Sequence, residues 1–196
     1  MHANSAAAQF SEWLRRIPSK FLKGREVVVS WTDAASSARM LSAVVFDGRV
    51  FEYTRMKAPD MIMDDLIQRD DGTIGLLELL AVLLVIETLK ETVMRAKWHA
   101  YIDNDGVLHS IIHASSKAVD VNHLVGLFWG RLHAMVTDVT AFRVESKAKI
   151  GDAGSRFEED ANLHDLKRLR AKFVSPRLLD FLYNIWSPLV ISVDDP

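Results

Sequence analysis

Four acidic residues, in the order Asp, Glu, Asp, Asp, lie where apolar segments of this sequence end or are interrupted. Asp33 ends VVVSWTD, Glu78 interrupts IGLLELLAVLLVI, Asp103 closes KWHAYID and Asp152 opens GDAGSRFEED. Carboxylate oxygens are the ligands that hard cations such as Mg²⁺ prefer. Two such ions can bind both the attacking and the leaving oxygen of a phosphodiester. The order of these acids therefore predicts a divalent-cation site suited to phosphodiester chemistry.

The N-terminal half of the sequence changes from a strand-like to a helix-like period. Apolar residues at alternate positions before Asp33 indicate a half-buried strand in which Trp31 and Asp33 share a face. Asp47-Gly48 between two further apolar segments is a strong hairpin signal, so three antiparallel strands are expected. A helix separates them from a fourth strand, which implies a crossover connection and parallel pairing. The expected elements are strands 27–33, 38–47, 49–57 and 97–103, a loop 58–73 and a helix 74–92.

The C-terminal half adds one strand among helical segments. Helices are expected at 106–116 and 121–136, a fifth strand at 137–145, and helices at 158–172 and 176–186. The fold class is therefore α/β, with a five-stranded mixed sheet whose first three strands are antiparallel, flanked by helices. The first and fourth strands are the natural central neighbours in this order. We divide the chain into an N-terminal arm or short helix (1–26), a main domain (27–160) and a C-terminal helical extension packed on that domain (161–196).

Composition limits the classes of protein to which the chain can belong. It has 196 residues, a net charge of −2 and no cysteine, which excludes disulfides and thiolate chemistry and fits an intracellular, reducing compartment. The longest apolar run, Ile74 to Ile86, is too short to cross a bilayer, so no membrane association is expected. The first ten residues lack the pattern of a secretory signal. Nucleic acid binding would need local basic patches, because the net charge is slightly negative.

Each acid also has a simpler structural explanation. Glu78 could lie on a narrow exposed stripe of its helix, and Asp33 and Asp103 could be ordinary turn residues. Asp152 could cap the helix that follows it. The joint arrangement favours a site, because the ends of adjacent first and fourth strands lie side by side beneath the first helix.

Histidine and basic residues give weaker signals. His109 and His113 lie four apart on one helical face, and His123 is a loose candidate for a third zinc ligand, so polar-face histidines are the better interpretation. Basic residues concentrate at 143–149 and 167–177. The second segment is typical of a solvated helix face, whereas the first leads into the last of the four acids and could position a nucleic acid strand.

Four motifs in order resemble a ribonuclease H domain, of the kind fused to reverse transcriptases of DIRS-like (tyrosine-recombinase) retroelements. WTDAASS resembles the first strand of that family, and IGLLELLAVLLVIETL resembles its helix with an internal Glu-Leu-Leu-Ala. YIDNDGVLHSIIHASSK resembles its Asp-Asn strand end and the following helix. RVESKAKIGDAGSR resembles the closing pattern V-P-S-x-x-N-x-A-D-x-P-S-R. The resemblance covers about residues 27 to 160.

The resemblance implies hydrolysis of the RNA strand of an RNA/DNA hybrid. Asp33, Glu78, Asp103 and Asp152 would be the catalytic residues and would hold two Mg²⁺ ions, for which Mn²⁺ could substitute. The hybrid would be recognised by its shape and 2′-hydroxyls, and a reverse transcriptase domain or a larger ribonucleoprotein would be the partner. Substrate contacts are expected from Asn104, Ser115, Lys117, Lys147 and Arg156.

Several residues depart from the family pattern and leave two other interpretations open. Glu145 stands where Pro is usual, Lys149 replaces Asn, and Gly151 and Gly154 replace Ala and Pro. No histidine lies between 134 and 163 to act as the mobile His of cellular ribonuclease H. One alternative is a nuclease or integrase of the same fold that acts on DNA. The other is a catalytically silent scaffold or nucleic-acid-binding module.

Overall fold

A six-stranded mixed sheet forms the centre of the protein. The computed structural model describes residues 26–60, 62–63, 73–145, 166–167 and 169–178. The strand order among them is β5-β4-β1-β2-β3-β6. The strands are β1 (Val27–Ala35), β2 (Met40–Phe46), β3 (Phe51–Lys57), β4 (Lys97–Ile102), β5 (Asp138–Arg143) and β6 (Lys172–Phe173).

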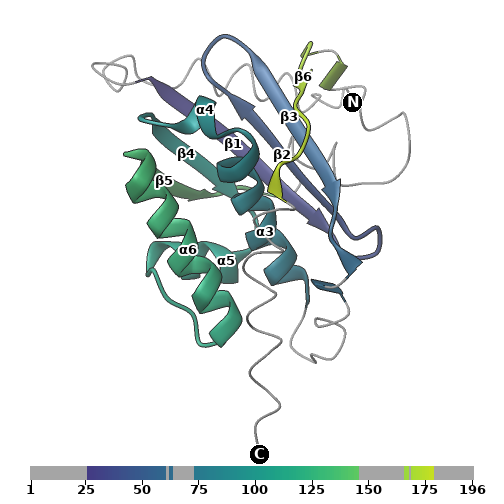
Figure 1. The fold of residues 1–196 in the computed structure, drawn as a ribbon, viewed down its shortest axis with the longest axis vertical. Helices are drawn as coiled ribbons and strands as arrows, with labels where there is room; N and C mark the ends of the chain where they lie inside the picture. The colour runs from purple at the N-terminus through teal and green to yellow at the C-terminus, as the bar shows by residue number, and fades with distance from the viewer. Residues whose placement is uncertain (1–25, 61, 64–72, 146–165, 168, 179–196) are drawn as a thin grey trace, which may run out of the picture.

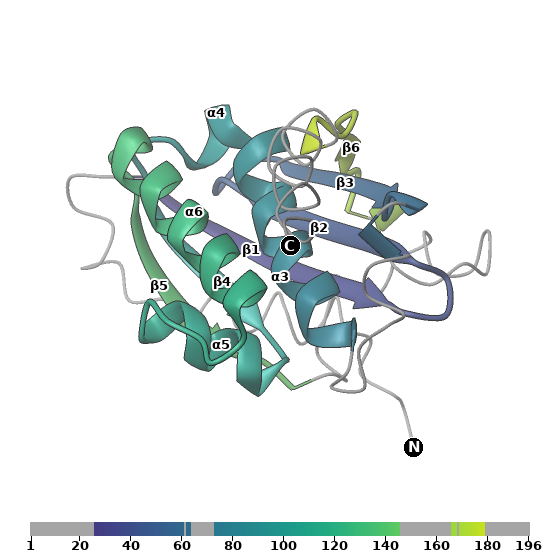
Figure 2. The same cartoon turned by 60° about the horizontal axis from the view of Figure 1, so that its bottom comes forward.

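The described helices pack together against one face of this sheet (Figures 1 and 2). Buried residues from all four of them join one hydrophobic cluster with that face. None of these helices is long and apolar enough to cross a membrane. The helices are α3 (Thr73–Thr88), α4 (Lys90–Val93), α5 (Asp105–Ile112) and α6 (Val119–Met135).

Strand pairing confirms the predicted topology of the first four strands. β1, β2 and β3 are antiparallel neighbours, and β4 pairs with β1 in parallel. Asp47 organises the predicted hairpin, because its Oδ1 accepts hydrogen bonds from the backbone N–H groups of Arg49 and Val50, both at 2.8 Å. Gly48 has a φ of +94°, a conformation that a glycine adopts without steric cost. β5 then extends the sheet in parallel beyond β4.

The central strand β1 is buried on both faces, which corrects the prediction of a half-buried strand. Its central position explains the difference, because α3 covers one face while Leu166 contributes to a smaller apolar cluster on the other. The side chains of Val29 and Trp31 belong to this second cluster. Within the helix-covered face, the indole Nε1 of Trp98 donates a 2.8 Å hydrogen bond to Ser30 Oγ and so links β4 to β1.

The C-terminal part of the described chain contacts both faces of the sheet. Leu166 is buried in the second cluster and Leu178 in the helix-covered one, so residues 169–178 pass around the β3 edge. β6 lies between these anchors and gives the sheet a sixth strand, which corrects the predicted count of five. The predicted helix 158–172 is wrong at its last residue, because Lys172 belongs to β6. Pairing with the edge of β3 offers Lys172 and Phe173 backbone partners that local propensity does not reveal.

The helical predictions differ from the structure in smaller ways. The predicted helix 74–92 is two helices, because α3 ends at Thr88 and α4 begins at Lys90. Part of the predicted loop 58–73 lies in the core, since Ile62 and Met63 are buried. The predicted helices 106–116 and 121–136 correspond to α5 and α6, and the strand 137–145 corresponds to β5.

Candidate metal centre

Parallel pairing of β1 and β4 brings two of the predicted acids to one edge of the sheet. Trp31 of β1 is in register with Tyr101 of β4. Asp33 and Asp103 each follow two residues later, so they occupy equivalent positions at the carboxyl ends of adjacent parallel strands. The sequence prediction that these strands are neighbours is confirmed.

Glu78 reaches the same place from α3. This helix is apolar on all sides and packs between the sheet and α6, so its residues from Leu76 to Ile86 are all buried. Glu78 itself is only 4% exposed, which rules out the exposed stripe as the reason for a charge at this position. A carboxylate in such surroundings has a high desolvation cost, which a cation or hydrogen-bond donors must offset.

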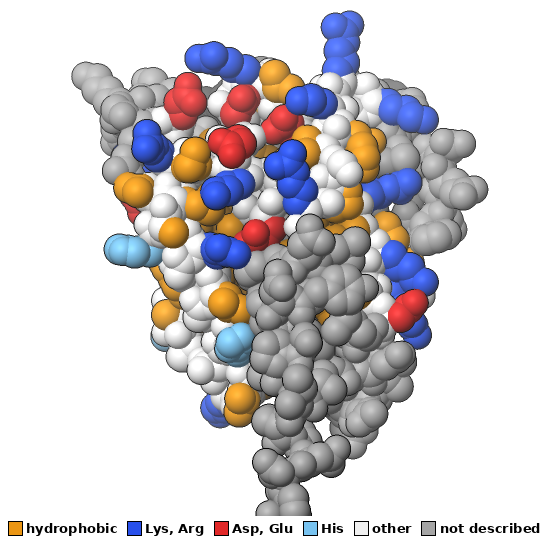
Figure 3. Space-filling view, in the orientation of Figure 1, with side chains coloured by type: hydrophobic (Ala, Val, Ile, Leu, Met, Phe, Trp, Pro, Cys, Tyr) orange, Lys and Arg blue, Asp and Glu red, His pale blue; other side chains and the backbone are white. Residues whose placement is uncertain are grey.

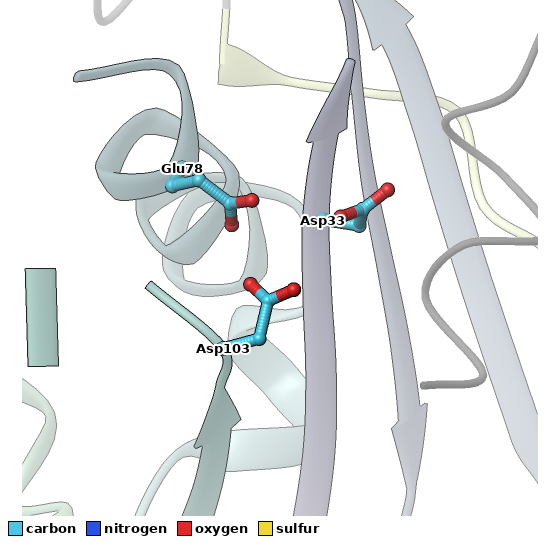
Figure 4. A group of neighbouring side chains, drawn as sticks. All are labelled: Asp33, Glu78 and Asp103. Carbon is cyan, nitrogen blue, oxygen red and sulfur yellow. The ribbon is translucent and has the colours of Figure 1, made fainter. Parts of the chain in front are cut away.

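The three carboxylates form a compact group. Asp33, Glu78 and Asp103 each offer an oxygen, and these oxygens all lie within 4.8 Å of one another. Figure 4 shows the three side chains and their origins: Asp33 on β1, Glu78 on α3 and Asp103 just after β4. Asp33 and Glu78 are buried while Asp103 is partly exposed, so the group opens to solvent on one side. An all-oxygen set of this size and charge can hold a metal ion. The fourth predicted acid, Asp152, lies outside the described residues.

Asn104 follows the group and has a structural role of its own. Its Oδ1 accepts a 3.1 Å hydrogen bond from the backbone N–H of Val107 and so caps α5. The Nδ2 atom faces Gly75 of α3, where an added Cβ would lie 3.9 Å from it. The cap fixes the start of α5 beside Asp103. The amide nitrogen of Asn104 takes no part in this cap and could donate to a substrate.

Two of the other predicted substrate contacts lie in the described part of the chain. Ser115 and Lys117 follow the far end of α5, an eight-residue helix that rises roughly 12 Å from its start near Asp103. Lys147 and Arg156 lie outside the described residues.

Arg55 is a residue that sequence reasoning missed. Asp33 pairs with Ser42 of β2, and Ser42 pairs with Arg55 of β3, so the three residues form one row across the sheet. Arg55 is partly buried, and its side chain makes no hydrogen bond or ion pair with any residue in the part of the chain that the structure describes. Strand alternation could have assigned it to the face of Asp33, but the row depends on a register that sequence alone leaves open.

Aromatic rings occupy the sheet row next to the carboxylates. Trp31 stacks on Tyr101 with ring centroids 5.8 Å apart, and Tyr101 stacks on Phe142 at 5.3 Å. Burial raises the pKa of Tyr101 to about 12, so its phenol is neutral at physiological pH. This packing links β1, β4 and β5 two residues before Asp33 and Asp103.

Comparisons with known proteins identify no family for this chain. No protein-family model matches it, and a search of curated proteins finds no match. The assignment of function therefore depends on the carboxylate group and on the order of the strands that carry it.

Proposed function

We propose that the protein is a ribonuclease H-like nuclease that hydrolyses the RNA strand of RNA/DNA hybrids with two Mg²⁺ ions. The observation that carries the proposal is the convergence of Asp33, Glu78 and Asp103 within 4.8 Å. Acids at these positions also match, one by one, the motifs by which the sequence resembles the ribonuclease H family. Hybrids of this kind arise in reverse transcription, so the proposal includes a reverse transcriptase domain or ribonucleoprotein as partner.

The strand order supports the same fold family. Three antiparallel strands, a crossover helix and a fourth strand parallel to the first agree with the expected ribonuclease H-like arrangement. In such a sheet the end of the first strand lies beside the end of the fourth, beneath the crossover helix. The sixth strand and the segment around it extend this plan at the edge of β3 without displacing it.

Each acid would have a defined part in the reaction. Asp33, Glu78 and Asp103 would provide oxygen ligands, with Asp152 completing the set. Bound Mg²⁺ ions would supply electrostatic stabilisation of the attacking water and the leaving 3′-oxygen. Core side chains surround Asp33 and Glu78 and hold both carboxylates in position before substrate arrives. Asp103, which is partly exposed, faces the side from which a phosphodiester could approach.

Arg55 offers this site a way to hold the nucleic acid backbone. It lies two strands from Asp33 in the same row, a separation of about 10 Å. A guanidinium at that distance could contact a phosphate near the scissile one. On the helix-covered side, Figure 3 shows basic side chains interspersed with acidic ones. Backbone binding on the Arg55 side is therefore part of the proposal.

A cleavage assay on matched substrates tests the proposal. The purified chain, with Mg²⁺ or Mn²⁺, should cut the RNA strand of a hybrid and leave duplex DNA of the same sequence intact, because recognition needs the 2′-hydroxyl. Asp33→Asn and Asp103→Asn should each abolish cleavage without unfolding the protein. Asp138→Asn is the matched control, since Asp138 is exposed and begins β5 at the opposite end of the sheet.

The other outcomes identify the alternatives. Equal cutting of duplex DNA would contradict the hybrid ribonuclease and would favour a DNA nuclease or integrase of the same fold. Metal binding with no cleavage of any nucleic acid would identify a silent scaffold or binding module. Full activity in Asp103→Asn would remove the carboxylate group from the mechanism.

A further inference from the structure

The exposed side of α5 carries two histidines whose rings lie against each other. His109 and His113 are both exposed, one helical turn apart, and their ring centroids are 3.9 Å apart with the planes inclined by 19°. Residues four apart on a helix lie on the same face, so both rings project to the same side of α5. This pair is separate from the carboxylate group and has no part in the proposed cleavage.

A hydrogen bond fixes which nitrogen of His113 is available to a ligand. Its Nδ1 lies 2.9 Å from the backbone carbonyl oxygen of His109. Because a carbonyl oxygen can only accept, Nδ1 must carry the proton. In the neutral ring, Nε2 then keeps its lone pair and is free of this contact. Metal-bound histidines are held in the same way, with the second ring nitrogen donating to a carbonyl or carboxylate.

We propose that His109 and His113 form a two-nitrogen binding site for a first-row transition-metal dication such as Cu²⁺, Ni²⁺ or Zn²⁺. Two imidazole nitrogens bound to one such ion, each at about 2.0–2.1 Å, lie roughly 3 Å apart. The ring centroids are 3.9 Å apart, and rotation about the side-chain torsions would have to turn the stacked rings so that one nitrogen of each points at the same ion. Imidazole suits these metals, whereas Mg²⁺ prefers oxygen.

The rest of the coordination sphere must come from outside this pair. Among the described residues, the only group of three or more histidine, cysteine or acidic side chains placed to share an ion is Asp33, Glu78 and Asp103. The histidine pair therefore leaves positions open for water or for a ligand from another molecule. Such a site binds metal more weakly than a closed structural zinc site and remains accessible.

Calorimetric titration of the full chain with Cu²⁺ tests the site. His109→Ala and His113→Ala should each weaken Cu²⁺ binding by at least about tenfold. Removal of a group that only hydrogen-bonds a metal ligand already lowers metal affinity about 10–100-fold, and each of these variants removes a ligand itself. His133→Ala is the matched control, as an exposed histidine in the last turn of α6. His2→Ala tests chelation by the chain terminus. Cu²⁺ binding at the histidine pair should be unchanged in Asp103→Asn, which alters only the carboxylate group. Excess Mg²⁺ should not compete with Cu²⁺ for the pair.

Electron paramagnetic resonance of the Cu²⁺ complex gives a second readout. Coupling to two imidazole nitrogens is expected in the native chain and to fewer in either single variant. Circular dichroism of each variant shows whether the protein remains folded. Unchanged Cu²⁺ affinity in His109→Ala, or an equal loss in His133→Ala or His2→Ala, would overturn the proposal. Failure of hybrid cleavage would leave it unaffected, because no carboxylate takes part.

Discussion

Glu78 and Glu87 belong to the same helix but have opposite surroundings. Glu87 has 16% of its side chain exposed, and its Oε1 lies 2.9 Å from Nε of Arg131 on α6. Glu78 is more deeply buried and lies with two other carboxylates, Asp33 and Asp103. An acid facing a cation contributes to the packing of α3 on α6. An acid grouped with acids lowers stability through like-charge repulsion, an arrangement that function explains better than folding does.

The largest difference between the two glutamates should appear in catalysis. Glu78→Gln should lower the rate of hybrid cleavage by at least ~100-fold, because metal ligands contribute several kcal/mol to transition-state stabilisation. Glu87→Gln makes the same chemical change on the same helix and should leave the rate within about twofold. Single-turnover cleavage at saturating Mg²⁺ measures both variants. Similar losses in the two would mean that α3 acts only through its packing.

Stability without metal should also separate them. Removing one of three clustered charges should make Glu78→Gln more stable than the native chain in EDTA, by about 1 kcal/mol or 2–4 °C in melting temperature. Millimolar Mg²⁺ should raise the melting temperature of the native chain but not that of Glu78→Gln. Thermal scans with and without Mg²⁺ measure this. An equal Mg²⁺-induced rise in both proteins would contradict a role for Glu78 in metal binding.

Thr54 provides a buried polar group away from the acids. It is fully buried on β3, and its Oγ1 has no hydrogen-bond partner among the described residues. Thr54→Val keeps the shape and should stabilise the protein by up to about 1 kcal/mol, equally with and without Mg²⁺. Thr92→Val is the control and should destabilise, because Thr92 Oγ1 donates a 2.6 Å hydrogen bond to Glu52. Urea midpoints measure both; a Mg²⁺-dependent effect at Thr54 would link it to the site.

The Glu87–Arg131 pair itself should contribute little. Arg131 is about half exposed, so water screens the pair and a coupling free energy of about 0.2–1 kcal/mol is expected. A double-mutant cycle with Glu87→Gln and Arg131→Met measures it from urea unfolding. A coupling free energy above 2 kcal/mol would show that Glu87, like Glu78, has a large energetic effect in the protein, and would contradict the contrast drawn between them.

The smallest expected effect concerns His99 of β4, whose ring makes an edge contact with Phe142. Burial lowers its pKa below the ordinary value of 6.5; the charge of Lys97 adds to this, and Asp138 opposes it. The unfolded chain therefore binds this proton more readily than the folded one. The contribution of neutral His99 to the free energy of unfolding is fully present above pH 6.5 and is lost as the pH falls through the lowered pKa. Between pH 8 and pH 5 the melting temperature of His99→Gln should decline less than that of the native chain. Parallel plots of melting temperature against pH for the two proteins would contradict this.

Local sequence signals predicted the parts of the fold that depend on local chemistry. Asp47-Gly48 marked the hairpin, and the crossover helix implied the parallel strand that ends at Asp103. The sixth strand could not be predicted, because Lys172 and Phe173 become a strand only by pairing with the distant edge of β3. The end of α3 at Thr88 also lacks a glycine or proline signal in the sequence.

The candidate site shows the same limit. Asp33, Glu78 and Asp103 were predictable because each interrupts an apolar pattern that its element requires. The position of Arg55 relative to Asp33 could not be predicted, since it depends on strand register, and the position of Ser115 depends on the length of α5. Distances between elements are tertiary properties, and a single sequence constrains them weakly.

The short strand β6 has a consequence for the behaviour of the protein in solution. Its residues pair with Glu52 and Tyr53, and the N–H of Val174 donates a 2.8 Å hydrogen bond to the Tyr53 carbonyl. Without this segment, β3 would present open backbone groups to other chains, the usual starting point for intermolecular sheet growth. A protein shortened before Lys172 would keep Asp33, Glu78 and Asp103 yet would be prone to aggregate. Its loss of activity would then report insolubility and not a missing catalytic group.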